Sequence, residues 1–236
     1  MAELLVFAPH PDDAEIHAGG IIAAMTRQGR SVAVIDATRG ELGSRGTPET
    51  RAIEATAASC ILGLAGRENL GLPDGAVPAD DPAARIQVVD AIRRHRPRTV
   101  LCLHGHARHP DHLNLARLVQ GAVKAAALYR LSTPSGAPAI AEVRLLFYEA
   151  ELAATPSCLV PLLAEDWARK MASIRCYGSQ LVRSGDQDGP ATSISNPEFL
   201  TWIEARGRTW GHQAGAAYAE ALIAPEPLRI VDPIGI

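Results

Sequence analysis

Two short segments of the sequence concentrate the side chain types that bind metal ions and transfer protons. The string HPDD occupies residues 10–13, and the string HPDH occupies residues 109–112. A catalytic zinc site needs two imidazoles and one carboxylate around an open coordination position. The two segments supply these and also a further carboxylate and imidazole, which could act as a base for water and as a group that stabilises an oxyanion. Together the motifs predict metal-assisted hydrolysis.

The adjacent carboxylates of Asp12 and Asp13 need a partner, because they follow an apolar run that we expect to be buried. Desolvation is costly for a carboxylate, and like charges repel. A divalent cation would remove the repulsion. The alternative for each motif alone is a helix start, with Asp12 or Asp13 capping one helix and Asp111 capping another. Two such motifs after two separate apolar segments favour one shared site.

Other histidines and arginines are weaker candidates for the site. His104 and His106 precede the second motif, and we expect them to support the site or to pack structurally rather than to bind metal. The glycine-rich loop 38–51 carries Arg39, Arg45 and Arg51, which could bind a substrate carboxylate or phosphate through paired hydrogen bonds. A solvated loop is the alternative for Arg39 and Arg45. Arg51 falls in the first turn of an expected helix, where a cation opposes the helix dipole, and this favours a functional role.

These motifs need a scaffold that joins distant segments, and strand-like segments alternate with helix-like ones along the chain. The expected strands are residues 3–9, 31–38, 98–105, 143–150 and 157–162, and residues 68–75 are expected to form a short strand and a turn. The expected helices are residues 15–29, 48–63, 82–95, 112–130, 164–176 and 197–215, and a tail follows the last of them. The alternation predicts an α/β fold, a Rossmann-like, mostly parallel sheet with helices on both faces, formed by residues 1–236 as a single domain. If strands 3–9 and 98–105 are neighbours, both motifs meet outside the carboxyl ends of the strands, where ligands bind in such folds.

The composition is that of a globular protein able to bury a core. Of 236 residues, 47% are hydrophobic and 21% are charged, and the formal net charge is -3. This charge gives no broad attraction to nucleic acid or to an anionic membrane. No segment is apolar over the length of a bilayer, and no signal-peptide pattern opens the sequence. The four cysteines lack C-x-x-C spacing, so we expect a cytoplasmic location and no thiolate zinc site.

The stretches PHPDDAEIHAGG and RHPDHLNLARLV resemble the two signature motifs of the LmbE-like (PIG-L) family of zinc-dependent N-acetylglucosaminyl deacetylases. DATRGELGSRGTPETR, LGLPDG and EARGRTWGHQAGAAYAEAL are similar to one branch, the bacillithiol-pathway deacetylase that acts on N-acetylglucosaminyl-malate. The similarity covers nearly the whole chain. It implies zinc-dependent hydrolysis of the N-acetyl group of an N-acetylglucosamine conjugate, with release of acetate and a free amine. It also implies a homo-oligomer, a trimer or a hexamer.

The resemblance implies a role for each matched position. His10, Asp13 and His112 match the zinc ligands, and iron(II) could replace zinc in this ligand set. The remaining matches are Asp12 as general base, His109 as the protonated group that stabilises the oxyanion or serves as acid, Asp111 as the carboxylate that orients a histidine, and Arg51 as a substrate contact.

The chain departs from the family pattern in two places. The family string often has glutamate directly after the aspartate pair, whereas here Ala14 intervenes before Glu15, as in the branch named above. The branch tends to carry a tyrosine shortly before the EAR string, where this chain has Phe199. Tyr177 is another candidate polar group near the site, although packing is the stronger reading for it.

Three alternatives stay open at this point. A neutral N-acetylated sugar of the chitobiose type could be the substrate in place of an anionic conjugate. A non-haem iron oxygenase could use His10, Asp12 and His112 as its facial triad, although Asp13 and His109 would then have no role. A non-catalytic sugar-binding module is the third alternative, and the presence of the expected catalytic residues argues against it.

Overall fold

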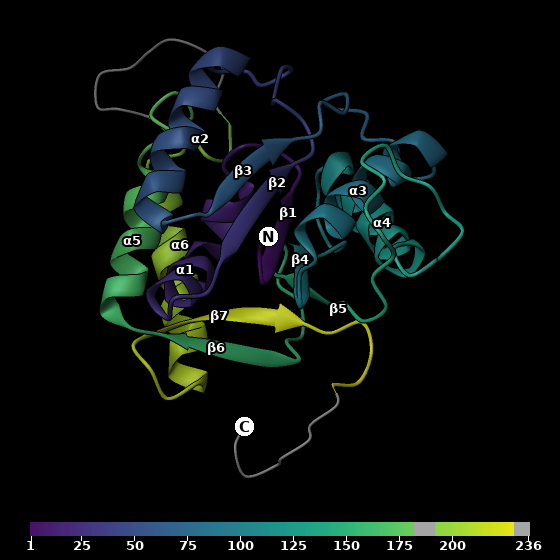
Figure 1. Cartoon of the computed structure of the whole chain (residues 1–236). Coiled ribbons are helices and arrows are strands. Elements are labelled where there is room, and N and C mark those ends of the chain that lie inside the picture. Colours follow the sequence, from purple (N-terminus) through teal and green to yellow (C-terminus); the bar gives the residue numbers. More distant parts are fainter. Residues whose placement is uncertain (182–191, 229–236) are drawn as a thin grey trace.

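The strand Leu4–Ala8 (β1) lies inside a mixed sheet, between two parallel neighbours (Figure 1). The computed structural model describes residues 1–181 and 192–228, and in these ranges the sheet has seven strands. The other strands are Val32–Asp36 (β2), Gly66–Asn69 (β3), Thr99–Leu103 (β4), Arg144–Tyr148 (β5), Cys158–Leu162 (β6) and Tyr218–Ile223 (β7). The helices are Asp13–Arg27 (α1), Pro48–Leu62 (α2), Pro82–His95 (α3), Pro110–Ala125 (α4), Ala164–Ile174 (α5) and Phe199–Gln213 (α6).

The order of the strands brings the two motifs together. Across the sheet the order is β3-β2-β1-β4-β5-β7-β6, and Leu4 is in register with Val32 on one side and with Thr99 on the other. The chain runs outward through β2 and β3 on one side of β1 and through β4 and β5 on the other. Ligands bind in α/β sheets at such a reversal of strand order. The predicted α/β fold with a mostly parallel sheet is confirmed.

Helices cover both faces of the sheet, as the sequence predicts (Figure 1). Successive side chains of a strand point to opposite faces. Leu5 and Phe7 accordingly pack into the core under α3 and α4, whereas Leu4 and Val6 pack into the core under α1. α5 and α6 form a further apolar cluster with α1 on that second face. β1 is therefore buried on both sides, which explains its continuous apolar sequence.

The end of the chain differs from the expectation. The sequence predicts a tail after the last helix, but residues 218–223 form β7, which pairs antiparallel with both β5 and β6. The segment YAEALI is rich in alanine, leucine and glutamate, which do not favour strands by themselves. Pairing with two neighbouring strands overrides this weak local preference. The structure thus adds an antiparallel side to a sheet whose other pairs are parallel.

A buried ion pair joins β7 to the helices beside it. Lys170 Nζ lies 2.5 Å from Glu220 Oε1, and both side chains are almost fully buried. The same carboxylate accepts the backbone N–H groups of Gly20 at 3.0 Å and Ile21 at 2.7 Å. Glu220 therefore connects three elements, β7, α5 and α1, at a single point.

Replacing Lys170 by methionine should destabilise the protein by about 3–5 kcal/mol, because it leaves the buried Glu220 carboxylate without its cation. The measurement is the free energy of unfolding in urea. Lys124→Met is the matched control, since Lys124 and Glu226 form an ion pair in which both side chains are largely exposed. We expect little change in that control. Equal losses in the two variants would contradict the importance of the buried pair.

Candidate active site

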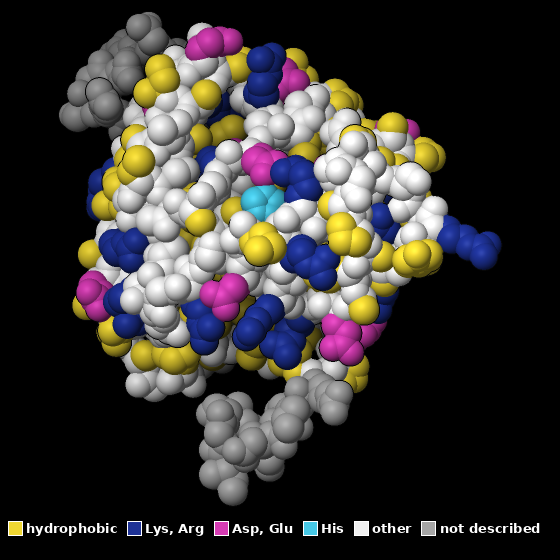
Figure 2. All heavy atoms as spheres, in the orientation of Figure 1, with side chains coloured by type: hydrophobic (Ala, Val, Ile, Leu, Met, Phe, Trp, Pro, Cys, Tyr) yellow, Lys and Arg dark blue, Asp and Glu magenta, His cyan; other side chains and the backbone are white. Residues whose placement is uncertain are grey.

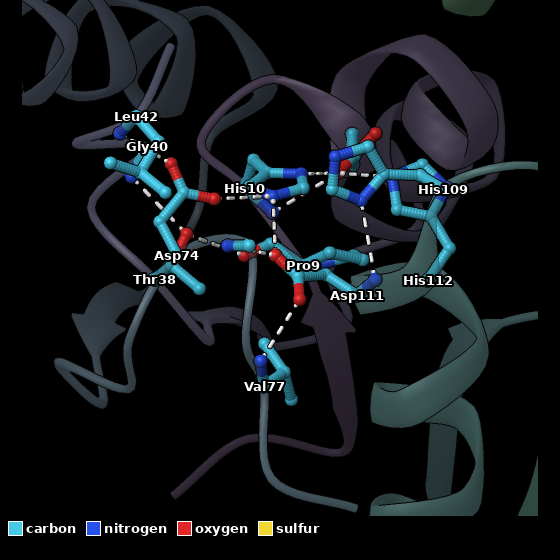
Figure 3. Close-up of polar contacts among 12 residues, drawn as sticks. Pro9, His10, Thr38, Gly40, Leu42, Asp74, Val77, His109, Asp111 and His112 are labelled. Atoms are coloured by element: carbon cyan, nitrogen blue, oxygen red, sulfur yellow. Dashed lines mark hydrogen bonds and ion pairs between the residues drawn. The ribbon is translucent and has the colours of Figure 1, made fainter.

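The two motifs meet beyond the carboxyl ends of β1 and β4 (Figure 3). His10 follows β1, Asp13 begins α1, and His112 lies in the first turn of α4. One ligand atom from each of these three side chains lies within 4.8 Å of the other two. Two imidazoles and a carboxylate are the donor set of a catalytic zinc site. The residues that the resemblance assigns to the metal are therefore close enough to share one ion.

Each ring nitrogen of His10 faces a carboxylate. Nδ1 lies 3.1 Å from Asp13 Oδ2, whereas Nε2 lies 3.0 Å from Asp74 Oδ1 and 3.3 Å from Asp111 Oδ2. A histidine that binds a metal typically donates its other ring N–H to a carboxylate, which fixes the orientation of the ring. With Asp74 and Asp111 holding Nε2, His10 presents Nδ1 toward Asp13.

His112 repeats this arrangement with different partners. Its Nε2 lies 3.4 Å from Asp13 Oδ2, and its Nδ1 lies 3.1 Å from Glu151 Oε1. Although burial opposes protonation, Asp13 and Glu151 raise the pKa of His112 to about 10. Burial alone would raise the pKa of Asp13, but His112 and His10 hold it well below its usual range. The residues thus fit a cation between two imidazoles and one carboxylate, with carboxylates behind both rings.

The Asp12 carboxylate is paired with Arg51. Its Oδ2 accepts a hydrogen bond from Arg51 Nη2 at 3.0 Å, and only 3% of the residue is exposed. Burial raises the pKa of Asp12 to about 7, although Arg51 opposes the rise. Asp12 occupies the N-cap position of α1 but makes no capping bond through its side chain, and its backbone is strained at φ 133°. The helix-cap alternative therefore does not account for the Asp12 carboxylate.

Arg51 reaches Asp12 from the first turn of α2. Its Nη2 also donates to the carbonyl of Pro11 at 2.7 Å, and its Nη1 donates to the carbonyl of Gly40 at 3.4 Å. Gly40 has φ +68°, and a Cβ built there would lie 2.0 Å from Arg51 Nη1. The loop thus needs glycine at this position to admit the guanidinium group. Arg51 borders the cavity described below, and its hydrogen bonds fix the position of Asp12.

His109 and Asp111 have separate tasks at the start of α4. His109 is the N-cap residue, and its Nδ1 accepts the backbone N–H of Asp111 at 3.2 Å. In the neutral ring the proton then lies on Nε2, and burial lowers the pKa of His109. The fully buried Asp111 carboxylate accepts the backbone N–H groups of Gly75 at 2.7 Å and Val77 at 2.9 Å. The histidine side chain that Asp111 contacts is His10.

An open cavity of about 640 Å³ lies at the site, and the residues that line it include His10, Asp12, Asp13, Arg51, His109 and His112. Leu42 and Trp202 border it with 71% and 53% of their surfaces exposed, so the cavity has an apolar rim. Phe199 also borders it, whereas Tyr177 is not among the lining residues and packs against α2. Arg45 is likewise not among the lining residues, and its backbone carbonyl accepts a hydrogen bond from a glutamine side chain.

The match to a known family decides what kind of protein carries this site. The family model PIG-L, described as GlcNAc-PI de-N-acetylase, matches residues 5–123, a stretch that includes both motifs. The chain belongs to this family. It is accordingly a metal-dependent deacetylase of N-acetylglucosamine conjugates.

Known proteins align with most of the length of this chain. A 1D-myo-inositol 2-acetamido-2-deoxy-alpha-D-glucopyranoside deacetylase from Rhodococcus opacus is 27% identical and aligns with 86% of this chain and 76% of its own length. The crystal structure of the conserved protein TT1542 from Thermus thermophilus is 38% identical, with a TM-score of 0.86 over 98% of each chain.

Two more distant structures share the fold of the PIG-L chain. N,N'-diacetylchitobiose deacetylase from Pyrococcus horikoshii is 20% identical, with a TM-score of 0.80 over 94% of this chain and 83% of its own. GalB from Pseudomonas putida, a 4-carboxy-2-hydroxymuconate hydratase, is 24% identical, with a TM-score of 0.77 over 98% and 99% of the two chains. Because a hydratase has this fold, the details of the reaction must be argued from the side chains.

Three residues lie near the site that the sequence did not assign to it. Asp74 holds His10 from the LPDG turn, a string noted in the sequence only for its resemblance. Glu151 follows β5 at the same end of the sheet as the motifs, and this position is the signal that could have revealed it. His17, one turn after Asp13 on α1, lies 3.9 Å from that carboxylate. Asp74 and Glu151 lie outside the two motifs, whereas His17 lies within the stretch PHPDDAEIHAGG.

The surface carries no single-sign field on the face that Figure 2 shows. Lys and Arg side chains are interspersed there with Asp and Glu side chains. Within residues 1–181 and 192–228, none of the helices has both the length and the apolar character needed to cross a membrane.

Replacing Arg51 by methionine should move the acidic limb of the profile of kcat/KM against pH to higher pH. Arg51 lowers the pKa of Asp12, so its loss keeps Asp12 protonated up to a higher pH, and a reaction that needs the carboxylate loses rate there. The measurement is kcat/KM across the pH range. The exposed Arg39 in the same loop supplies the control variant Arg39→Met, which should leave the limb in place. If the acidic limb of the profile does not move in Arg51→Met, the proposed effect of Arg51 on the pKa of Asp12 is refuted.

Proposed function

We propose that the chain hydrolyses the acetamide of N-acetylglucosaminyl-malate in bacillithiol biosynthesis, with zinc held by His10, Asp13 and His112. The observation that carries the proposal is the different environment of two adjacent carboxylates. Asp13 faces the two imidazoles, which hold its pKa low. Asp12 faces Arg51 and has a pKa of about 7. One carboxylate is thus suited to a cation, and the other is suited to exchange a proton at neutral pH.

When bound, zinc supplies Lewis-acid polarisation of the substrate carbonyl and makes water easier to deprotonate. Iron(II) could supply the same chemistry in this donor set. Asp12, with its position fixed by Arg51, takes the proton from the attacking water. His109 lines the cavity with the proton of its neutral ring on Nε2, from which it can donate a hydrogen bond to the developing oxyanion. Asp12 then returns a proton to the amine that leaves.

An anionic conjugate is supported by a basic side chain on the cavity wall. Arg108 borders the cavity and is exposed. A guanidinium group can bind a carboxylate through two parallel hydrogen bonds. The sequence offers Arg45 and Arg51 for this task; Arg51 also borders the cavity, and Arg108 is a further candidate. The trimeric or hexameric assembly remains a prediction of the resemblance, and the cytoplasmic location remains a prediction from the sequence.

A panel of substrates tests the proposal. N-acetylglucosaminyl-malate, the inositol glycoside named above and N,N'-diacetylchitobiose are assayed for acetate and free amine, with and without chelator. We expect the highest kcat/KM with the malate conjugate, and loss of activity with chelator. Asp12→Asn should keep its metal but lose about 10²–10⁴-fold in rate, because the base is gone.

Each other outcome of the panel has a definite meaning. A preference for the inositol glycoside or the chitobiose would overturn the malate assignment and leave deacetylation intact. No acetate from any of the substrates, or full activity after metal removal, would contradict the proposed reaction.

A further inference from the structure

The C-terminal helix α6 holds the segment that follows β5. Arg206 donates two hydrogen bonds to successive backbone carbonyls, from Nη1 to Ala150 at 2.5 Å and from Nη2 to Glu151 at 2.8 Å. One helical turn further on, Trp210 Nε1 donates to Glu149 Oε2 at 2.9 Å. Arg206 and Trp210 of α6 thus form hydrogen bonds with residues 149–151, three consecutive residues outside regular secondary structure.

The segment 149–151 carries Glu151, whose carboxylate contacts the Nδ1 side of the His112 ring. Glu151 Oε1 is 3.1 Å from His112 Nδ1, a close ion-pair contact rather than an aligned hydrogen bond. Neither His112 Nδ1 nor Glu151 Oε2 has a hydrogen-bond partner among the described residues, and both atoms are buried. Glu151 is therefore positioned to balance the charge of His112 at Nδ1 and to orient the ring.

We propose that Arg206 is a positioning residue for the metal site. By fixing the carbonyls on both sides of the Glu151 Cα, Arg206 sets the backbone from which the Glu151 side chain reaches His112. Glu151 in turn orients the ring whose Nε2 faces Asp13. The inference rests on the proposed metal site, and it explains why α6 bears an arginine and a tryptophan one turn apart.

The geometry favours this role over a substrate contact. Both terminal nitrogens of Arg206 are engaged by backbone carbonyls, and its Nε lies 3.7 Å from Glu149 Oε2. The guanidinium group therefore has no free edge for a bidentate contact with a carboxylate. The side chain is 35% exposed where it borders the cavity, so a substrate contact remains the outcome to test against.

The test is the zinc dissociation constant of the full chain, measured without substrate by competition with a chromogenic chelator. Loss of an outer partner of a metal ligand typically weakens metal binding by about 10–100-fold, and we expect this range for Glu151→Gln. Arg206→Met should weaken zinc binding by about 10-fold, and Arg206→Lys, which keeps one donor, should fall between Arg206→Met and the wild type. Arg208→Met, on the same helix but 58% exposed, is the matched control and should bind zinc as the wild type does.

The double variant Glu151→Gln/Arg206→Met decides whether Arg206 acts through Glu151. We expect the double variant to bind zinc about as weakly as Glu151→Gln alone, because the two changes interrupt one chain of contacts. Effects that multiply, or an unchanged zinc affinity in Arg206→Met, would overturn the proposal. An unchanged affinity with a raised KM would assign Arg206 to the substrate instead.

Two further measurements separate this proposal from other causes. The thermal midpoint of each variant shows whether it is folded, and Arg206→Lys keeps the test open if Arg206→Met does not fold. His112→Ala tests the metal site itself. If zinc binds equally well without His112, the proposed site is wrong, whereas loss in His112→Ala with none in Glu151→Gln overturns only the inference about α6.

Discussion

The two buried carboxylates at the end of β1 are the constraint on which the rest of the structure depends. Asp12 and Asp13 are neighbours in the chain, and both are almost completely removed from water. Two like charges in such a place require opposing charges that keep them apart. The protein meets the requirement in two directions, with Arg51 beside Asp12 and with the imidazoles of His10 and His112 beside Asp13.

The fold can be understood as the device that brings these opposing groups together. β1 and β4 are adjacent and parallel, so the segments after them reach the same end of the sheet. α2 carries Arg51 back over that end, and the segment after β5 adds Glu151. α6, on the antiparallel side of the sheet, then holds the Glu151 segment through the hydrogen bond that Arg206 donates to the Glu151 carbonyl. The groups around the site thus come from segments spread along the chain.

The sequence was sufficient for the features that depend on local pattern. Apolar runs predicted the alternating elements and the parallel core, and the expected helices 48–63 and 82–95 agree closely with α2 and α3. The two motifs carried strong residue-type signals, and strand adjacency was the one assumption needed to join them. The structure places these residues together in the way that the assumption required.

Other features could not be predicted because they depend on tertiary contacts. β7 is a strand only because β5 and β6 pair with it, against a sequence of weak strand preference. Asp74 and Glu151 are single acidic residues whose meaning comes from the histidines that they contact. Arg45 and Arg108 look alike in sequence, and only the shape of the cavity separates them.

The most direct test of the divided roles of Asp12 and Asp13 is a crystal structure of the zinc-loaded protein, with anomalous diffraction recorded at the zinc edge. The account predicts one anomalous peak at this end of the sheet, bonded to His10, Asp13 and His112, with Asp12 turned to Arg51 and outside bonding distance. A peak bonded to Asp12 in place of Asp13, or to His109 and Asp111, would contradict it.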